Sequence, residues 1–502
     1  MIDLLGVAAD VFTLATLTAI VVGTLLGIVI GALPGLGSVV GISICLPFTF
    51  GMAPLTSISL LLGVYCGSVY GGSISAILIN TPGTPQAAAT SLDGYPMAVR
   101  GEAARAIGWA TAASVAGGLF SCALLIAAAP QLARFAVHFG SVEVFALILL
   151  ALTCIAAVSS NSLIKGLLMG TLGLFIALIG ADPVTGAQRF TFGIQHLAGG
   201  VDLIAVVVGL FALSEAFSRI AVLGSPPKEV LATWMRLPGL RDWRGRWRIL
   251  GQSSLIGSVV GALPGTGAAT AAFIAYAFAR QTSANGQRFG DGEPDGIIAA
   301  ESSNNAVTGS AMIPTLALGI PGDVVTAILL GAFVIHGIVP GVRLMTEHAD
   351  TVNGLFLSLI LINLVMLLLA FPVVRLFGRL LAVPQRYILT GVVVLSLIGT
   401  AAVRGSPYDP LVAVLFGIVG FVLRRHDYPL APLVIGLVLG PQLEAALRRG
   451  LLIHDNDFLA FLTHSWISAT LFAGTLLMIV LTILHTRLGR QNSRSATENT
   501  HP

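Results

Sequence analysis

The sequence predicts an all-α polytopic membrane protein, and two observations support that prediction first. Of the 502 residues, 56% are hydrophobic and only 10% are charged, whereas soluble domains carry about 25% charged residues. Long stretches also lack Asp, Glu, Lys and Arg, and the longest covers residues 11–92. Because one helix needs about 20 apolar residues to cross a bilayer, we expect roughly eleven to thirteen transmembrane or re-entrant helices.

A duplicated segment divides the chain into two related halves. Residues 27–37 are GIVIGALPGLG and residues 257–267 are GSVVGALPGTG, with eight of eleven positions identical. A weaker similarity follows each copy, between residues 80–83 (NTPG) and residues 319–322 (GIPG). Internal repeats of this kind are typical of secondary transporters. About seven spans are expected between the copies, and an odd number favours inverted repeats. This count leaves the parity open.

Composition places the boundaries around these halves. We expect a first membrane repeat over residues 1–223 and a second over residues 249–450, joined by a linker at residues 224–248. Six basic and two acidic residues lie between Lys228 and Arg248, so the positive-inside rule predicts a cytoplasmic linker. A C-terminal transmembrane helix is expected over residues 451–486. The polar tail, residues 487–502, is predicted to be disordered and cytoplasmic.

The start of the chain and its cysteines favour a retained multi-pass protein without a metal centre. No basic segment precedes the first apolar run, so we interpret that run as a helix rather than a cleaved signal peptide. The four cysteines lie in apolar runs, and none forms a Cys-x-x-Cys pair. We therefore expect no disulfide framework and no bound metal. A net charge of +3 is too small to indicate a nucleic-acid partner.

The Pro-Gly-x-Gly part of each repeat predicts a helix broken inside the membrane. Proline removes a backbone donor and glycine permits positive φ, and irregular backbone at that depth is tolerated where it is buried or lines a cavity. The free N–H groups at a half-helix N-terminus can hold a carboxylate. The predicted substrate-binding residues here are Pro34, Gly35, Gly37, Pro264, Gly265, Thr266 and Gly267. The alternative for Gly23, Gly27, Gly31, Gly257 and Gly261 is helix packing alone.

Polar segments downstream of each break are further candidates. We predict substrate binding at Asn80, Thr81, Pro82, Gly83, Pro321 and Gly322. We predict cation coupling at Glu301, Ser303, Asn304, Asn305 and Asp323, because amides and carboxylates in an apolar run are costly unless they have partners. The alternatives are a helix N-cap at the membrane surface for residues 301–305 and for Asn80-Thr81, and a loop-end carboxylate in water for Asp323.

Enzymatic motifs fail at specific positions. A dinucleotide fingerprint needs a third glycine where Val40 and Thr270 stand, and no phosphate-loop motif occurs. Residue 320 is Ile where an intramembrane aspartyl protease needs glycine. The chain is therefore not expected to be an enzyme or to carry a cofactor.

Three blocks resemble the large membrane subunit of the tripartite tricarboxylate transporters, the TctA type. The first joins residues 31–37 to 65–73 (YCGSVYGGS), 80–85 (NTPGTP) and 93–96 (DGYP). The second joins residues 261–267 to 301–305 (ESSNN) and 319–323 (GIPGD). The third covers residues 428–436 and 440–441.

The resemblance implies two partners, a small four-helix membrane subunit and a periplasmic binding protein. It also implies a di- or tricarboxylate or a related organic acid as substrate, an Na⁺ or H⁺ gradient as energy source, and a bacterial inner membrane as the location.

Our leading hypothesis is a secondary transporter whose two halves move against each other around an anion held between the breaks. A stand-alone organic-anion symporter and an anion channel are the alternatives, and a membrane-embedded enzyme is the least favoured. The sequence leaves open which carboxylate is transported, the coupling ion and its stoichiometry, the oligomeric state, and whether the motion is elevator-like or rocking.

Overall fold

The computed structural model describes residues 4–158, 162–182, 185–220, 234–265, 267–381 and 383–498. Over these ranges the chain is helical apart from loops and one short hairpin of β1 (Gly180–Ala181) and β2 (Gln188–Arg189). Within the same ranges, seven helices are long and apolar enough to cross a membrane, and five shorter apolar helices accompany them. The predicted all-α polytopic class is confirmed.

The chain forms two compact units. Unit 1 contains residues 1–134 and 204–421, and unit 2 contains residues 135–203 and 422–502. The elements of unit 1 are α1 (Leu4–Val11), α2 (Leu14–Ala32), α3 (Gly37–Cys45), η1 (Leu46–Thr49), α4 (Pro54–Ile79), η2 (Pro85–Ala87), α5 (Ala88–Met97), η3 (Ala98–Glu102), α6 (Ala103–Ala136), α9 (Leu203–Val207), η5 (Val208–Leu213), α10 (Ser214–Ile220), α11 (Trp247–Ala262), α12 (Gly267–Thr282), η6 (Gly286–Arg288), α13 (Pro294–Ser310), α14 (Met312–Leu318), α15 (Val324–Ile335), α16 (Val342–Glu347), α17 (Ala349–Leu381), α18 (Gln385–Arg404) and α19 (Tyr408–Arg425). Those of unit 2 are α7 (Ser141–Val158), α8 (Leu163–Ala177), the hairpin, η4 (Gln195–Leu197), α20 (Leu430–Ile453), α21 (Phe458–Leu462) and α22 (Trp466–Glu498). The predicted repeats were defined by sequence similarity and these units by contacts, so the units do not test the repeat boundaries. Those boundaries stay predictions.

Helices α2 and α4 of unit 1 pack backbone against backbone. A Cβ atom built on Gly23, Gly27 or Gly31 would lie 2.2, 2.5 or 2.1 Å from a carbonyl oxygen of α4. Glycines of α4 face α2 in the same way, because a Cβ on Gly67 would lie 2.4 Å from the Thr24 carbonyl. The glycine spacing therefore does pack helices, which is the alternative that the sequence left open.

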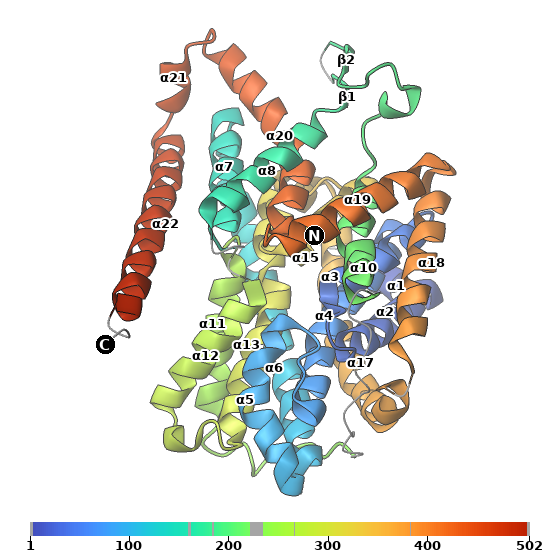
Figure 1. Cartoon of the computed structure of the whole chain (residues 1–502), viewed down its shortest axis with the longest axis vertical. Helices are drawn as coiled ribbons and strands as arrows, with labels where there is room; N and C mark the ends of the chain where they lie inside the picture. The colour runs from blue at the N-terminus through green and yellow to red at the C-terminus, as the bar shows by residue number, and fades with distance from the viewer. Residues whose placement is uncertain are drawn as a thin grey trace. The chain divides into compact units, whose positions relative to one another are not determined.

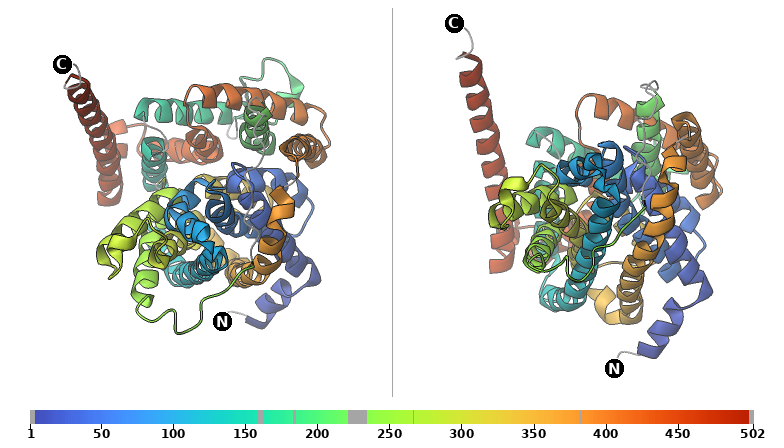
Figure 2. Two further views of the ribbon diagram at one scale, coloured as in Figure 1. Left: turned by 60° about the horizontal axis from the view of Figure 1, so that its bottom comes forward. Right: turned by 90° about the horizontal axis from the view of Figure 1, so that it is seen from below.

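The second half repeats this packing with α11 and α13. A Cβ on Gly257 of α11 would lie 2.2 Å from the Ser303 carbonyl of α13. The equivalent residue of the first half is Gly27 of α2, where a Cβ would lie 2.5 Å from the Val64 carbonyl of α4. Helix α13 is therefore the counterpart of α4. Figure 1 and both views of Figure 2 show α11, α12 and α13 side by side with α5 and α6.

The counterpart helices α4 and α13 run in opposite directions. Cys66 of α4 interacts with Thr308 of α13, whereas Tyr70, one turn later on α4, interacts with Glu301, two turns earlier on α13. This order is antiparallel, and it is the arrangement that inverted repeats require. The structure thus answers the question of parity that the span count left open.

Unit 2 packs α8 against α20 through glycine. A Cβ on Gly173 would lie 2.0 Å from the Leu433 carbonyl, and one on Gly436 would lie 2.3 Å from the Gly170 carbonyl. The C-terminal helix α22 continues to Glu498, past residue 486, where we expected disorder to begin. The physical reason is that no proline interrupts the chain between Trp466 and Glu498.

Candidate functional site

The first repeat is broken where Pro34 and Gly35 predicted it. Helix α2 ends at Ala32, Leu33 is extended with φ −83° and ψ 116°, and α3 begins at Gly37. Gly35 and Gly37 adopt φ +80° and +64°, which costs an L side chain about 1–2 kcal/mol. These two glycines let the chain turn between the half-helices without that cost.

The second break has the same backbone geometry. Helix α11 ends at Ala262, Leu263 is extended with φ −89° and ψ 122°, and α12 begins at Gly267. Gly265 and Gly267 adopt φ +89° and +70°. Pro264 lies within this break. Thr266 lies outside the described residues, so its predicted role stays a prediction.

Each break is approached by the turn of a helical hairpin from its own half. The first hairpin turns at residues 80–84, between α4 and α5, and the second at residues 319–323, between α14 and α15. Asn80 ends α4 with φ +51°, and Gly319 ends α14 with φ +70°. After Pro82, a Cβ on Gly83 would lie 1.8 Å from the Gly31 carbonyl. After Pro321, a Cβ on Gly322 would lie 2.9 Å from the Gly261 carbonyl. These glycines therefore allow close approach to the break.

The side chains of Asn80 and Thr81 are exposed and belong to the end of α4. The Thr81 hydroxyl donates to the Ile79 carbonyl at 3.2 Å, and the Thr81 amide donates to the Ser75 carbonyl at 3.4 Å. Asn80 is therefore the C-cap of α4, so the alternative of a helix N-cap at this position is wrong. A role of Asn80 and Thr81 in substrate binding stays a prediction.

Asp323 caps the helix that follows the second hairpin. Its Oδ1 accepts from the Thr326 amide at 2.8 Å, in a capping box, and its Oδ2 accepts from the Tyr65 hydroxyl at 2.9 Å. The carboxylate is therefore an N-cap of α15 that also joins the two halves. A role in cation coupling stays a prediction.

The structure brings an arginine to the first break that the sequence analysis missed. A Cβ on Gly35 would lie 1.1 Å from Nη2 of Arg219, so the guanidinium occupies the space beside this glycine. Glu215, one turn earlier on α10, accepts from Nε of Arg219 at 2.7 Å. The sequence signal was a Glu and an Arg four residues apart at the end of an apolar helix. Nothing in the sequence links them to Gly35.

Two buried hydroxyls near this break lack hydrogen-bond partners among the described residues. Ser38 lies in the first turn of α3 and is 5% exposed, and Thr84 follows the first hairpin and is 2% exposed. The methyl group of Thr84 lies 4.0 Å from a Cβ built on Gly37. Arg219, the N-terminal N–H groups of α3 and these two hydroxyls together offer donors suited to an anion.

The polar run of α13 lies inside unit 1. Helix α13 begins at Pro294, and residues 294–310 are all buried, so the alternative of an N-cap at the membrane surface for residues 301–305 is wrong. The Asn304 amide and the Ser303 hydroxyl have no hydrogen-bond partner among the described residues. Asn305 donates to the Glu301 carbonyl at 3.1 Å.

Glu301 itself is fully buried and bonded by hydroxyl groups from the first half. The Ser114 hydroxyl of α6 donates to Oε2 at 2.8 Å, and the Thr90 hydroxyl of α5 donates to Oε1. Among the residues that the structure describes, Glu301 has no Lys, Arg or His as ion-pair partner. It is therefore a buried carboxylate that lacks a countercharge in the described part of the chain.

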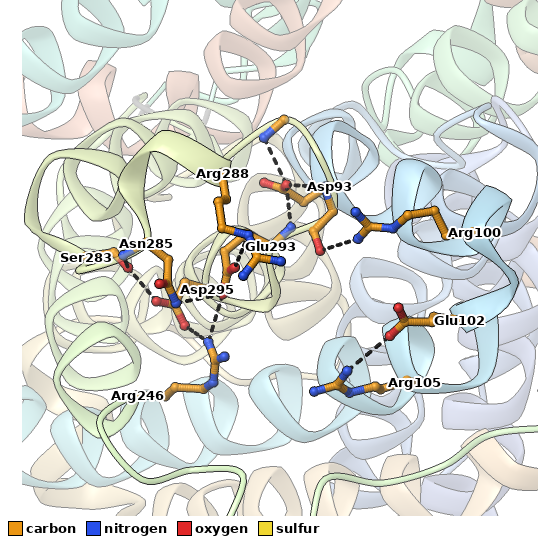
Figure 3. Close-up of polar contacts among 12 residues, drawn as sticks. Asp93, Arg100, Glu102, Arg105, Arg246, Ser283, Asn285, Arg288, Glu293 and Asp295 are labelled. Carbon is orange, nitrogen blue, oxygen red and sulfur yellow. Dashed lines mark hydrogen bonds and ion pairs between the residues drawn. The ribbon is translucent and has the colours of Figure 1, made fainter.

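A second buried carboxylate, Asp93, joins α5 to the loop before α13. Its Oδ1 accepts from the amides of Gly290, Gly292 and Glu293 at 2.8–2.9 Å, and its Oδ2 accepts from the Tyr276 hydroxyl at 2.7 Å. Figure 3 shows this contact beside the ion pairs of Arg246 with Glu293 and Asp295. Both oxygens of Asp93 thus accept hydrogen bonds, one from backbone N–H groups and the other from a hydroxyl.

Two inverted halves with paired helix breaks define a polytopic membrane protein of the secondary-transporter type. The chain belongs to the tripartite tricarboxylate transporter TctA family, whose sequence profile matches residues 17–435. It is therefore a component of a tripartite tricarboxylate transporter.

Two relatives come from Agrobacterium vitis. One, described as an uncharacterized 52.8 kDa protein in the TAR-I ttuC' 3' region, is 37% identical over 469 residues, which is 92% of each chain. The other, an uncharacterized protein in the TAR-II ttuC' 3' region, is 36% identical over 228 residues, covering 45% of this chain and 94% of its own length. No solved structure matches this chain.

Proposed function

We propose that this chain is the large permease subunit of a binding-protein-dependent secondary transporter. It imports tricarboxylates, dicarboxylates or related organic acids across a bacterial inner membrane, driven by an ion gradient. A small four-helix membrane subunit and a periplasmic solute-binding protein are its partners. Family membership supports the class of transporter.

The observation that carries this proposal is the first helix break. Arg219 provides a positive charge against Gly35, and Ser38 and Thr84 provide hydroxyls that lack partners among the described residues. Charge-assisted hydrogen bonds to a carboxylate are about twice as strong as neutral ones. A carboxylate of the substrate therefore replaces solvent at this break. The second break contributes backbone N–H groups at the start of α12, near Gly267, because the Gly265 amide already donates to the Gly322 carbonyl at 2.8 Å.

The basic end of unit 1 supports the proposed orientation. Arg100 donates to the Gly292 carbonyl at 2.9 Å, and the amide of Arg236 in the linker donates to the Ala104 carbonyl at 2.9 Å. The linker and the loop before α13 therefore share one end of unit 1 with several arginines. Under the positive-inside rule this end faces the cytoplasm.

The test is uptake of radiolabelled citrate by cells that express the chain together with its small subunit and binding protein. Gly35→Leu and Gly265→Leu should each abolish uptake while membrane insertion remains normal, because a side chain at these φ values strains the break. Normal uptake by both variants removes the proposed site. Flux that does not saturate and needs no binding protein favours a channel instead.

Arg219→Gln tests the charge itself. Loss of a hydrogen bond to a charged group costs about 1.5–3 kcal/mol, so we expect citrate affinity to fall by roughly ten- to a hundredfold. The matched control is Arg105→Gln, which removes an exposed arginine paired with Glu102 at 3.0 Å and should leave affinity unchanged. Equal citrate affinities for the two variants would show that Arg219 does not bind the anion.

A further inference from the structure

The two buried carboxylates of unit 1 have partners of different chemistry. Asp93 accepts on one oxygen from three backbone N–H groups, which can donate but cannot accept, and on the other from the Tyr276 hydroxyl. Glu301 is surrounded by the hydroxyls of Thr90 and Ser114 and by the Asn305 amide. A hydroxyl can donate to a carboxylate, and after rotation it can accept from a carboxylic acid. The surroundings of Glu301 therefore fit both the charged and the neutral form.

The absence of a countercharge favours a group that alternates between these forms. A charge taken out of water without a paired opposite charge is strongly disfavoured. Glu301 is 0% exposed, and its partners in the described residues are all neutral. Binding one proton removes the charge without displacing any of these partners.

Among the described residues, the titratable groups on the helices around Glu301 have partners of their own. Tyr70 of α4 faces Glu301, and its hydroxyl bonds Thr111 of α6 at 2.8 Å. On α5 the nearest carboxylate is Asp93, one turn beyond Thr90, and on α12 the Tyr276 hydroxyl donates to it. The charged residues flanking α11 and α13, Arg246 with Glu293 and Asp295, are paired with one another.

The position of Glu301 connects the halves and the proposed site. It lies on α13 in the second half, while Thr90 and Ser114 belong to the first. One turn further along α13, the Asn304 amide is buried without a partner among the described residues. A movement of α13 relative to α5 and α6 would separate the carboxylate from both hydroxyls, which would open it to a proton from one side.

We propose that Glu301 is the proton-carrying residue of the transport cycle. A proton from the outer solution binds the Glu301 carboxylate, forming one O–H bond, and the same bond breaks when the proton leaves to the inner solution. The coupling ion is then H⁺, and each proton offsets one negative charge of the imported carboxylate. This inference rests on the proposed function for its role in transport. Proton binding by Glu301 can be tested without it.

Proton binding is measured on the purified chain by infrared difference spectroscopy between acidic and alkaline pH. The wild type should show a carboxylic-acid carbonyl band with a component that is missing in Glu301→Gln. An unchanged band in Glu301→Gln overturns the inference, whether or not the protein transports anything. If Glu301→Gln fails to fold, Thr90→Val and Ser114→Ala serve instead. Each removes a hydroxyl partner and should change the pH midpoint of the band, and an unchanged midpoint in both overturns the inference.

Coupling is measured with citrate as the probe and with the partner subunits present. Glu301→Gln should lose at least about tenfold in accumulation driven by a pH gradient, yet should still exchange internal for external citrate. Glu102→Gln, which changes an exposed carboxylate, should retain both activities. Accumulation by Glu301→Gln equal to that of the wild type, or accumulation driven only by a Na⁺ gradient, overturns the inference while the proposed function stands. Failure of the wild type to take up or exchange citrate overturns the proposed function instead.

Discussion

The two halves of unit 1 hold each other at two equivalent contacts of unequal strength. In the first, Asp93 of α5 accepts three hydrogen bonds from the loop before α13 and a fourth from Tyr276 of α12. In the second, His336 is the C-cap of α15, and its Nε2 lies 3.0 Å from the Thr49 hydroxyl in η1, just before α4. Because Thr49 donates to the Leu46 carbonyl, it accepts from His336.

This difference shows what duplication keeps and what it changes. The backbone geometry is similar at both breaks and at the left-handed helix ends Asn80 and Gly319. The side chains have diverged, so the basic end is held by a charged group and the opposite end by a neutral pair. A movement that separates the halves therefore costs less free energy at the Thr49–His336 contact, and the Asp93 contact is the better hinge.

The largest expected effect comes from breaking the Asp93 contact. Asp93→Ala leaves three backbone N–H groups and the Tyr276 hydroxyl without their acceptor. Buried donors left unsatisfied cost about 1–3 kcal/mol each, so the free energy of unfolding should fall by about 3 kcal/mol or more. Thermal unfolding of the purified protein measures this. The control Glu102→Ala, at an exposed ion pair, should change stability by less than about 1 kcal/mol, and equal losses would refute the distinction.

The next effect separates the two breaks. Gly35→Ala and Gly265→Ala place a Cβ at similar positive φ, which should cost each variant about 1–2 kcal/mol of stability. Gly35→Ala also displaces the Arg219 guanidinium. We therefore expect citrate affinity to fall more in Gly35→Ala than in Gly265→Ala. Equal affinities, measured by calorimetry, would show that the breaks contribute equally.

A smaller effect is expected at the bond between Tyr65 and Asp323. Tyr65→Phe removes one donor to a carboxylate that Thr326 still caps, so the loss should be about 1 kcal/mol. Asp323→Ala removes the cap as well and should cost about 1 kcal/mol more. Chemical denaturation of both variants and of the double variant measures the coupling. If the stability losses of the two single variants add up to that of the double variant, the bond between Tyr65 and Asp323 does not contribute to stability.

The smallest effect concerns pH at the weaker contact. Burial lowers the pKa of His336 below its usual 6.5, so the folded protein favours the neutral ring. The stabilisation is complete above pH 6.5 and is lost as the pH falls through the lowered pKa. His336→Gln should remove this part of the pH dependence, with a change below about 1 kcal/mol. Unfolding midpoints at several pH values test this, and identical profiles for the variant and the wild type would contradict it.

The sequence predicted the features that depend on local chemistry. Pro34-Gly35 and Pro264-Gly265 located both breaks to within a few residues, because only glycine suits their positive φ. Residues 301–305 were selected because adjacent polar side chains are costly in an apolar run. The prediction of disorder at residues 487–498 was wrong because it rested on polar composition alone. A polar composition does not show whether a helix continues.

What the sequence could not predict depends on contacts between distant segments. Arg219 reaches Gly35 only because α10 packs near the first break, and no spacing rule connects the two positions. The hydroxyls that bond Glu301 come from α5 and α6, and nothing marks Thr90 or Ser114 among the many hydroxyl residues of this chain. The roles of all these residues in binding and coupling remain predictions that the variants above address.

The glycine contacts between α2 and α4 have a mechanical consequence. Gly23, Gly27 and Gly31 place the two backbones in direct contact over three successive turns, with no side chains between them that could change rotamer to absorb a shift. Sliding one helix along the other by less than a full turn would push Cα atoms into carbonyl oxygens. The two helices must therefore move together as one rigid body. The conformational change that transport needs must then occur in the segments after them, residues 33–37 after α2 and residues 80–84 after α4.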